Sequence, residues 1–412
     1  MSLGLYISVP FCRSKCTYCN FASGVFSAGQ MERYVDRLIE DLNGFRALAA
    51  KQGAEVPETV DSLYLGGGTP SLLPPEELKK LFFAVRQQFK LLPKAELTVE
   101  CAPGTLTGPI IQALVTRGVN RVSLGVQSFV DKEAASVARL HTREKTLGDI
   151  DRLRQAGIAN INVDLIAGLP HQTRESWEYS LQQAIAAGVP HVSVYLLEVD
   201  EDSRLGRELI AGGARYHAHF VPDDDLTADF YEIACARLAA AGIEQYEISN
   251  FARPGFESRH NLKYWTRQPY AGFGVDAHSM LPMNAQLRDE GVDASRLATT
   301  DNYDRYLAGP LAPAELDERY LSAVSMEQAL EESFFLGLRL NRGVDLAALR
   351  KKFGDSAKKF DPRISRLVRE GLLARSGDNV HLTPRGRLLS NEVFARFIGV
   401  ERPAIQEIPE AG

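Results

Sequence analysis

The chain has 412 residues, of which 45% are hydrophobic and 24% are charged, the ordinary range for a soluble globular protein. Its 47 Lys and Arg against 53 Asp and Glu give a formal net charge of −6, which argues against a nucleic-acid binder with a basic face. The sequence shows neither an apolar run of about 18 residues nor a secretory signal, so we expect a cytoplasmic protein with no integral membrane span.

Short β-rich runs alternate with segments of helical spacing from the start of the chain. The runs expected to be strands are Leu3–Val9, Ser62–Leu65, Leu97–Glu100, Arg121–Val126, Asn160–Ile166 and His191–Leu197. Met31–Leu48 and Thr173–Ala187 are examples of the helical segments. Strands that alternate with helices predict βαβ units and a parallel sheet. We therefore predict the α/β class, as a partial (β/α) barrel of six parallel strands with its chemistry just after the strand ends.

The composition changes after the barrel pattern. A seventh β-like run, Gln245–Ile248, precedes a stretch rich in Gly and aromatic residues, Tyr264–His278. Thr299 to Glu318 is rich in Pro, Ala and acidic residues, which indicates a linker. We therefore predict a barrel with an extension over 1–298 and a linker over 299–325.

The last part of the chain has a different pattern. Three helices are expected, over Met326–Arg339, Leu346–Phe353 and Pro362–Glu370, followed by a β-hairpin that turns at Ser376–Asn379. This order resembles a winged helix. We predict a small C-terminal winged-helix-like domain over 326–412, and its spread charges do not indicate nucleic-acid binding.

Three of the five cysteines, Cys12, Cys16 and Cys19, lie within eight residues, with the spacing C-x₃-C-x₂-C directly after the first strand. Five cysteines are too few for a disulfide scaffold, so the cluster indicates metal or redox chemistry in a reducing compartment. Three thiolates on one loop can hold three irons of a [4Fe-4S] cluster and leave the fourth iron open to S-adenosylmethionine. Structural zinc is the alternative, but it prefers four ligands, and neither a His nor a fourth Cys lies nearby.

With these residues the sequence resembles the radical S-adenosylmethionine proteins. Within them it is most similar to the branch that contains oxygen-independent coproporphyrinogen III dehydrogenases and the heme chaperone HemW. The resemblance covers nearly the whole chain from Tyr6 onward. It implies a [4Fe-4S] cluster on the three cysteines and S-adenosylmethionine as a second cofactor.

A pocket for S-adenosylmethionine is implied at successive strand ends. Gly66–Pro70 (GGGTP) follows the second strand, and glycines let backbone groups approach a ligand closely. The resemblance assigns Gly67, Gly68 and Thr69 to the methionyl amino group. It assigns further ligand contacts to Glu100, Gln127, Arg139 and Asp164, and packing near the ligand to Tyr6 and Tyr18. Taken singly, each of these residues has a structural alternative, and Ala102 stands where the family commonly has Asn.

Three features favour the chaperone branch over the dehydrogenases. Phe21 stands where the dehydrogenases carry a further cysteine, and Cys12 lies close to the start of the chain. His260–Trp265 (HNLKYW) matches HNxxYW, a signature of the HemW branch. Histidine is a suitable axial ligand for heme iron. His260 is therefore the candidate heme ligand, with a structural histidine packed against Tyr264 and Trp265 as the alternative.

The remaining motifs are weaker. The other histidines, His278 among them, are expected to be structural or solvated. Gly272–Ala277 matches GxGxxA, but no convincing strand precedes it, so we do not expect dinucleotide binding.

The resemblance implies a heme chaperone that binds heme and passes it to an acceptor hemoprotein. An electron donor would serve the cluster. We do not expect coproporphyrinogen III dehydrogenase activity. That dehydrogenase and a radical S-adenosylmethionine methyltransferase are the alternatives.

Overall fold

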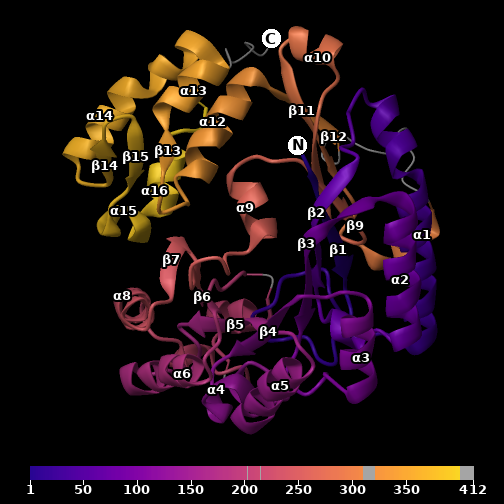
Figure 1. Cartoon of the computed structure of the whole chain (residues 1–412). Helices are drawn as coiled ribbons and strands as arrows, with labels where there is room; N and C mark the ends of the chain where they lie inside the picture. The colour runs from indigo at the N-terminus through magenta and orange to yellow at the C-terminus, as the bar shows by residue number, and fades with distance from the viewer. Residues whose placement is uncertain (202, 214, 310–320, 400–412) are drawn as a thin grey trace, which may run out of the picture. The chain divides into compact units, whose positions relative to one another are not determined.

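The computed structural model describes residues 1–201, 203–213, 215–309 and 321–399. The chain forms two compact units, the first over residues 1–264 and 268–323, the second over residues 265–267 and from 324 onward. A twelve-stranded sheet has the strand order β12-β11-β10-β9-β1-β2-β3-β4-β5-β6-β8-β7 (Figure 1). The first and last strands in this order are different, so the sheet is open and the barrel is partial.

The centre of the sheet consists of parallel strands that follow one another in the chain. They are β1 (Leu3–Val9), β2 (Thr59–Gly67), β3 (Lys90–Cys101), β4 (Arg121–Gln127), β5 (Asn160–Ala167) and β6 (His191–Leu196). The six predicted parallel strands are thus confirmed, and β1 has the predicted bounds. A seventh parallel strand, β9 (Tyr270–Phe273), pairs with β1. β9 was not predicted, because a strand of four residues, two of them small, has too short a pattern to be recognised in the sequence.

Short strands border this parallel core. Antiparallel pairs join β6 to β8, β8 to β7, β9 to β10 and β10 to β11. Their bounds are β7 (Glu244–Glu247), β8 (Asn250–Ala252), β10 (His278–Pro282), β11 (Val292–Ala298) and β12 (Leu321–Ser325). The β9–β10 hairpin extends the sheet beyond β1.

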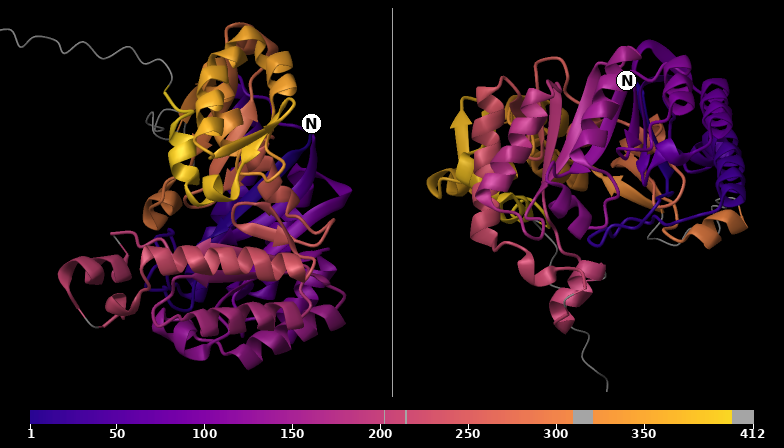
Figure 2. Two further views of the ribbon diagram at one scale, coloured as in Figure 1. Left: turned by 90° about the vertical axis from the view of Figure 1, so that its left-hand side faces the viewer. Right: turned by 90° about the horizontal axis from the view of Figure 1, so that it is seen from below.

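Helices cover the outer side of the parallel strands, as Figures 1 and 2 show. The helices of the first unit are α1 (Ala28–Lys51), α2 (Pro75–Gln88), α3 (Gly108–Thr116), α4 (Asp131–Ser136), α5 (Arg143–Gln155), α6 (Arg174–Ala186), α7 (Arg204–Ala211), α8 (Asp224–Ala240), α9 (Arg259–Trp265), α10 (Ala285–Asp289) and α11 (Tyr303–Ala308). α6 begins with a capping box, in which the Thr173 side chain accepts from the Ser176 amide and Ser176 bonds back. Within the described ranges, no helix is both long enough and apolar enough to cross a membrane.

The two faces of the sheet differ in chemistry. Successive side chains of a strand point to opposite faces, and register partners point to the same face. In β5, Ile161, Val163 and Leu165 are fully buried on the outer face, which packs against the helices. Asn162 and Asp164 alternate with them and face inward, opposite Ser123 and Gly125 of β4. The sequence therefore makes an apolar outer core and a polar inner surface from the same strands.

The second unit contains a helical bundle and a small sheet. Its elements are α12 (Met326–Gly337), β13 (Val344–Asp345), α13 (Leu346–Phe353), α14 (Asp361–Arg369), β14 (Leu373–Ser376), β15 (Asn379–Leu382), α15 (Pro384–Leu388) and α16 (Ser390–Ala395). The β14–β15 hairpin closes with the Ser376–Asn379 pair, where the turn is predicted. Phe334 packs on Phe360 and Phe397, with ring centroids 4.7 and 4.9 Å away.

The predicted domain boundaries stay predictions. The predicted linker, 299–325, includes α11 and β12, while 310–320 lie outside the described residues. The predicted C-terminal domain, 326–412, likewise extends past the last described residue, 399.

Candidate functional site

The loop after β1 carries the three clustered cysteines. Cys16 is buried, and Cys12 and Cys19 are half-buried. The Cys12 amide donates to the Gly24 carbonyl at 2.8 Å, and this bond closes the loop. Two side chains from other elements reach the sulfurs. Arg139 Nη1 donates to Cys16 Sγ at 3.5 Å, and Thr69 Oγ1 donates to Cys12 Sγ at 3.9 Å.

The donors around this loop fit a thiolate-bound cluster. The sulfurs of an iron–sulfur cluster commonly accept hydrogen bonds, and Arg139 and Thr69 supply such donors here. Arg139 Nε and Thr17 Oγ1 are buried and have no hydrogen-bond partner among the described residues. A buried donor without a partner is costly, so these atoms are suited to a group that the chain itself does not supply. Within the described ranges, no three His, Cys, Asp or Glu side chains are arranged around a single metal ion.

The glycine loop at the end of β2 packs directly against the start of the cysteine loop. Gly67 has φ +95°, a left-handed conformation that favours glycine. A Cβ on Gly68 would lie 2.7 Å from the Val9 carbonyl oxygen, so only glycine fits there. The Gly67 amide donates to Glu100 Oε2 at 3.1 Å, which connects the loop to the next predicted ligand.

Glu100 and Asp164 share a polar pocket of about 40 Å³ on the inner face of the sheet. Tyr64 donates to Glu100 Oε1 at 2.7 Å. Asp164 accepts from Asn162 Nδ2 at 2.7 Å and from Ser123 Oγ at 3.1 Å. Burial raises the pKa of Glu100 to about 7, and it also raises the pKa of Asp164. Both carboxyl groups are therefore held in surroundings that favour the neutral form.

Gln127 and Arg139 lie beside this pocket. Gln127 has φ +68° at a register irregularity between β4 and β5, a strained conformation for a residue with a side chain. Arg139 Nη2 donates to the Gly125 carbonyl, and Gly125 is the register partner of Asp164. A Cβ on Gly125 would lie within 3.2 Å of both the Arg139 and Gln127 side chains. Arg139 thus extends from the cysteine loop to the strand ends that carry Asp164.

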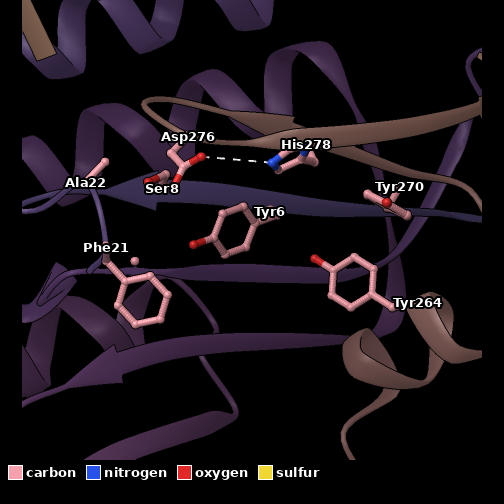
Figure 3. Close-up of a pocket in the computed structure, with 9 residues that line it drawn as sticks. Tyr6, Ser8, Phe21, Ala22, Tyr264, Tyr270, Asp276 and His278 are labelled. Carbon is pink, nitrogen blue, oxygen red and sulfur yellow. Dashed lines mark ion pairs between the residues drawn. The ribbon is translucent and has the colours of Figure 1, made fainter. Parts of the chain in front are cut away.

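A second, larger cavity of about 420 Å³ borders the glycine loop at Gly67 (Figure 3). Its lining residues are Tyr6, Ser8, Phe21, Ala22, Gly67, Tyr264, Tyr270, Asp276 and His278. The Tyr264 and Tyr270 rings meet at 87°, with their centroids 4.6 Å apart. We call this space the aromatic cavity. Of the residues predicted to contact S-adenosylmethionine, Glu100 and Asp164 line the polar pocket, whereas Tyr6 and Gly67 line the aromatic cavity. The remaining predicted residues line neither space; they are Tyr18, Gly68, Thr69, Gln127 and Arg139.

Tyr6 and Tyr18 lie in different surroundings. Tyr6 lines the aromatic cavity, and its ring stacks on Tyr64 at a centroid distance of 6.1 Å. Tyr18 packs against a small apolar cluster formed by Val137, Ile166 and Leu169. Tyr6 is therefore placed at the boundary between the two cavities, and Tyr18 is placed beside the cysteine loop.

The three ring side chains of the HNLKYW signature have three different positions. His260 is 1% exposed, and both ring nitrogens are bonded, Nδ1 to Ser62 Oγ at 3.0 Å and Nε2 to Tyr264 Oη at 2.8 Å. Burial lowers the pKa of His260 to about 3, so its ring is neutral. Trp265 belongs to the second unit, where the Arg339 guanidinium lies 4.1 Å from its ring centre. Tyr264 is the signature residue that lines the aromatic cavity.

Several site residues were missed by sequence reasoning. Tyr270, Asp276 and His278 line the aromatic cavity, although the sequence indicated only a weak glycine motif around them. The polar row of the inner face was also missed. Its signal is the alternation of apolar residues with polar or small ones through β4, RVSLGVQ, and through the first six residues of β5, NINVDL.

Comparison with known proteins identifies two family regions. The radical SAM superfamily matches residues 6–184, and the HemN C-terminal domain matches residues 324–389. The heme chaperone HemW of Lactococcus lactis is 34% identical over 396 residues, covering 95% of this chain and 96% of the relative. The heme chaperone HemW of Bacillus subtilis is 34% identical over 398 residues, 96% of this chain and 98% of the relative.

A further relative and a solved structure also match this chain. The heme chaperone HemW of Escherichia coli is 32% identical over 402 residues, 96% of this chain and 98% of the relative. Coproporphyrinogen III oxidase (HemN) from Escherichia coli has a TM-score of 0.78 at 22% identity, covering 96% of this chain and 90% of that one. At that identity the structural likeness establishes the fold.

Proposed function

The chain belongs to the HemW family of radical S-adenosylmethionine proteins, and we propose that it binds heme and passes it to an acceptor hemoprotein. The observation that carries the proposal is the aromatic cavity, which lies beside the cysteine loop and shares Gly67 with the predicted cofactor site. The cysteine loop and the aromatic cavity thus lie next to each other, as the proposal requires.

The proposal assigns the cofactors to the strand ends. Cys12, Cys16 and Cys19 would hold the [4Fe-4S] cluster, and an external electron donor would serve it. S-adenosylmethionine would be held near the open iron by the backbone of Gly67 and Gly68 with Thr69, and by Glu100, Gln127, Arg139 and Asp164. Tyr6 and Tyr18 would pack beside it. When bound, this pair of groups supplies one-electron chemistry at the sulfonium.

The heme assignment follows from the size and lining of the aromatic cavity. Its volume of about 420 Å³ is in the ordinary range for small-molecule sites, roughly 300–1,000 Å³. Tyrosine rings present flat apolar faces, and their hydroxyls can bond to the polar edge of a ligand. Heme has flat apolar ring faces and anionic propionates, so tyrosine rings can pack on its faces and their hydroxyls can bond to its propionates.

Phe21 favours a carrier over the dehydrogenase. Its side chain is 60% exposed at the cavity, where an apolar ring can cover a bound porphyrin. The further cysteine of the dehydrogenases would instead place a reactive thiol there. The dehydrogenase is therefore the weaker of the two proposals for this chain.

One anaerobic experiment tests the proposal. Protein with its cluster reconstituted is titrated with ferric heme while the Soret band is followed, and the same preparation is incubated with coproporphyrinogen III, a reductant and S-adenosylmethionine. We expect saturable heme binding and no conversion to protoporphyrinogen IX. Steady conversion would favour the dehydrogenase. Absence of both binding and conversion would favour a radical methyltransferase.

A further inference from the structure

We infer that His278 is the axial ligand of the heme iron, and that the signature histidine His260 is a positioning residue that orients Tyr264. This inference rests on the proposed function, because it names the residue that would hold the cargo. The sequence-based candidate, His260, lies on α9, whereas His278 lies on β10.

His278 has the access that a heme ligand requires. It begins β10, its side chain is 66% exposed, and it lines the aromatic cavity (Figure 3). Neither ring nitrogen makes a hydrogen bond to the described residues, and the nearest carboxylate oxygen, Asp276 Oδ1, lies 3.9 Å from Nε2. A neutral imidazole nitrogen binds iron through its lone pair, so the ring must have a nitrogen that is not already engaged.

Asp276 lies close enough to His278 to fix the orientation of its ring. Metal-binding histidines commonly direct their second nitrogen toward a carboxylate, which fixes the ring orientation. Asp276 lies two residues before His278 and lines the same cavity. Figure 3 shows the pair on the side of the cavity opposite Tyr264. A heme ligated by His278 would therefore have Tyr6 and Tyr264 as neighbours across the cavity.

Both ring nitrogens of His260 are already hydrogen-bonded, so neither is available to bind iron. Axial ligation by His260 would break its bond to Ser62 or to Tyr264 and leave a buried polar group without a partner. With these bonds intact, His260 anchors the Tyr264 hydroxyl, and Tyr264 in turn packs edge-on against Tyr270. The HNxxYW spacing places the histidine and the tyrosine four residues apart, on one side of α9. The signature thus builds a wall of the cavity.

The other histidines do not have this combination of access and position. His141 and His191 are 6% and 1% exposed and are hydrogen-bonded. His171 and His217 are bonded to each other at 3.3 Å. His219 and His381 line neither described cavity, and His381 lies in the second unit.

The test compares four variants with the wild-type chain, each with its cluster reconstituted. Ferric heme is titrated into wild type, His278→Ala, His260→Ala, Tyr264→Phe and the matched control His219→Ala. We expect His278→Ala to lose the Soret shift of a histidine-ligated heme and to bind at least about tenfold more weakly. Free imidazole should restore the ligated spectrum in His278→Ala. His219→Ala should behave as wild type.

The His260→Ala variant should give a different result in the same titration. His260→Ala and Tyr264→Phe should both weaken heme binding, while the bound heme keeps the wild-type Soret position, because the iron ligand is retained. Iron content and circular dichroism check that each variant is folded. If His278→Ala keeps the wild-type spectrum while His260→Ala loses it, the assignment is wrong. If wild type binds no heme, the proposed function itself fails.

Discussion

The polar pocket and the aromatic cavity lie on the same face of one sheet, yet they differ about tenfold in volume, about 40 against about 420 Å³. In the polar pocket, side chains such as Asn162, Ser123 and Asp164 bond to one another and fill the space. In the aromatic cavity, the Tyr264 and Tyr270 rings pack against each other and leave the centre open. The first arrangement suits the positioning of charge, and the second suits a flat cargo.

The boundary between the polar pocket and the aromatic cavity is thin. The stacked Tyr6 and Tyr64 rings, 6.1 Å apart, separate them, and Gly67 borders both, since its amide bonds to Glu100 and its backbone lines the aromatic cavity. The inner face of one parallel sheet can thus hold two cavities whose linings differ in chemistry. Each prediction below changes one site and asks whether the other is affected.

The largest expected effect is on the cluster. Replacing Cys12, Cys16 and Cys19 together with Ser should reduce bound iron from about four per chain to background, because no thiolate remains to hold the cubane. Heme binding in the aromatic cavity should persist. Iron analysis and the visible absorption of reconstituted protein measure this, and Cys235→Ser serves as the control. A triple variant with a full cluster would exclude this loop as the site.

The next effect is on S-adenosylmethionine. Asp164→Asn keeps the shape of the side chain but replaces one carboxyl oxygen with an NH₂ group that can only donate, and it should weaken binding by about tenfold, the usual size for the loss of one buried hydrogen bond. Heme affinity should stay within about twofold, because Asp164 lines the polar pocket only. Isothermal titration under anaerobic conditions measures the first quantity. Asp151→Asn, an exposed position on α5, is the control.

The pH dependence of stability gives a third test. The pKa of Glu100 is raised to about 7 by burial, while the unfolded-state value is about 4.3. The folded state therefore keeps a proton that the unfolded state releases, so the free energy of unfolding falls as pH rises from about 5 to about 7. Glu100→Gln should remove about 1–3 kcal/mol of this fall. Urea unfolding at several pH values checks it, and an unchanged slope would show that Glu100 is ionised throughout.

The matched control for the pH test is Glu76→Gln at the start of α2. Its side chain is 75% exposed and forms an ion pair with Lys79 at the surface. An exposed ion pair contributes little to stability. The free energy of unfolding of Glu76→Gln should therefore change with pH as it does in wild type.

The smallest effect is expected at Phe21. Phe21→Ala should weaken heme binding by about two- to fivefold, because a ring that is 60% exposed can bury only part of its surface on the cargo. The cluster should be unaffected, because Phe21 supplies no ligand to it. Heme titration and iron content measure the two outcomes. A loss of heme binding as large as that of His278→Ala would make Phe21 a central contact.

The parts that could be predicted from the sequence are those with local signals. β1, the alternation of strands and helices, and the hairpin turn at Ser376–Asn379 depend on periodicity and turn residues, and the structure has them. The cysteine spacing is also local. The aromatic cavity could not be predicted in this way, because Tyr6 and Tyr264 come from distant segments. They are brought together by long-range contacts, such as the pairing of β1 with β9 and the bond of His260 to Ser62 on β2.

His260 shows the limit of a motif most clearly. Its spacing to Tyr264 is visible in the sequence, but its bond to Ser62 across 198 residues is not, and that bond completes the engagement of the ring. His278 had no motif of its own, and its position becomes informative only once the cavity is known.

We expect heme and S-adenosylmethionine to depend on different side chains, although Tyr6 and Gly67 border both sites, and paired titrations of Tyr264→Ala and Asp164→Asn test this expectation. Both ligands are titrated into both variants, with the cluster reconstituted. We predict that Tyr264→Ala weakens heme binding by about tenfold and leaves S-adenosylmethionine binding within about twofold, and that Asp164→Asn does the reverse. A variant that weakens both ligands equally, with its fold and iron content intact, would contradict the separation.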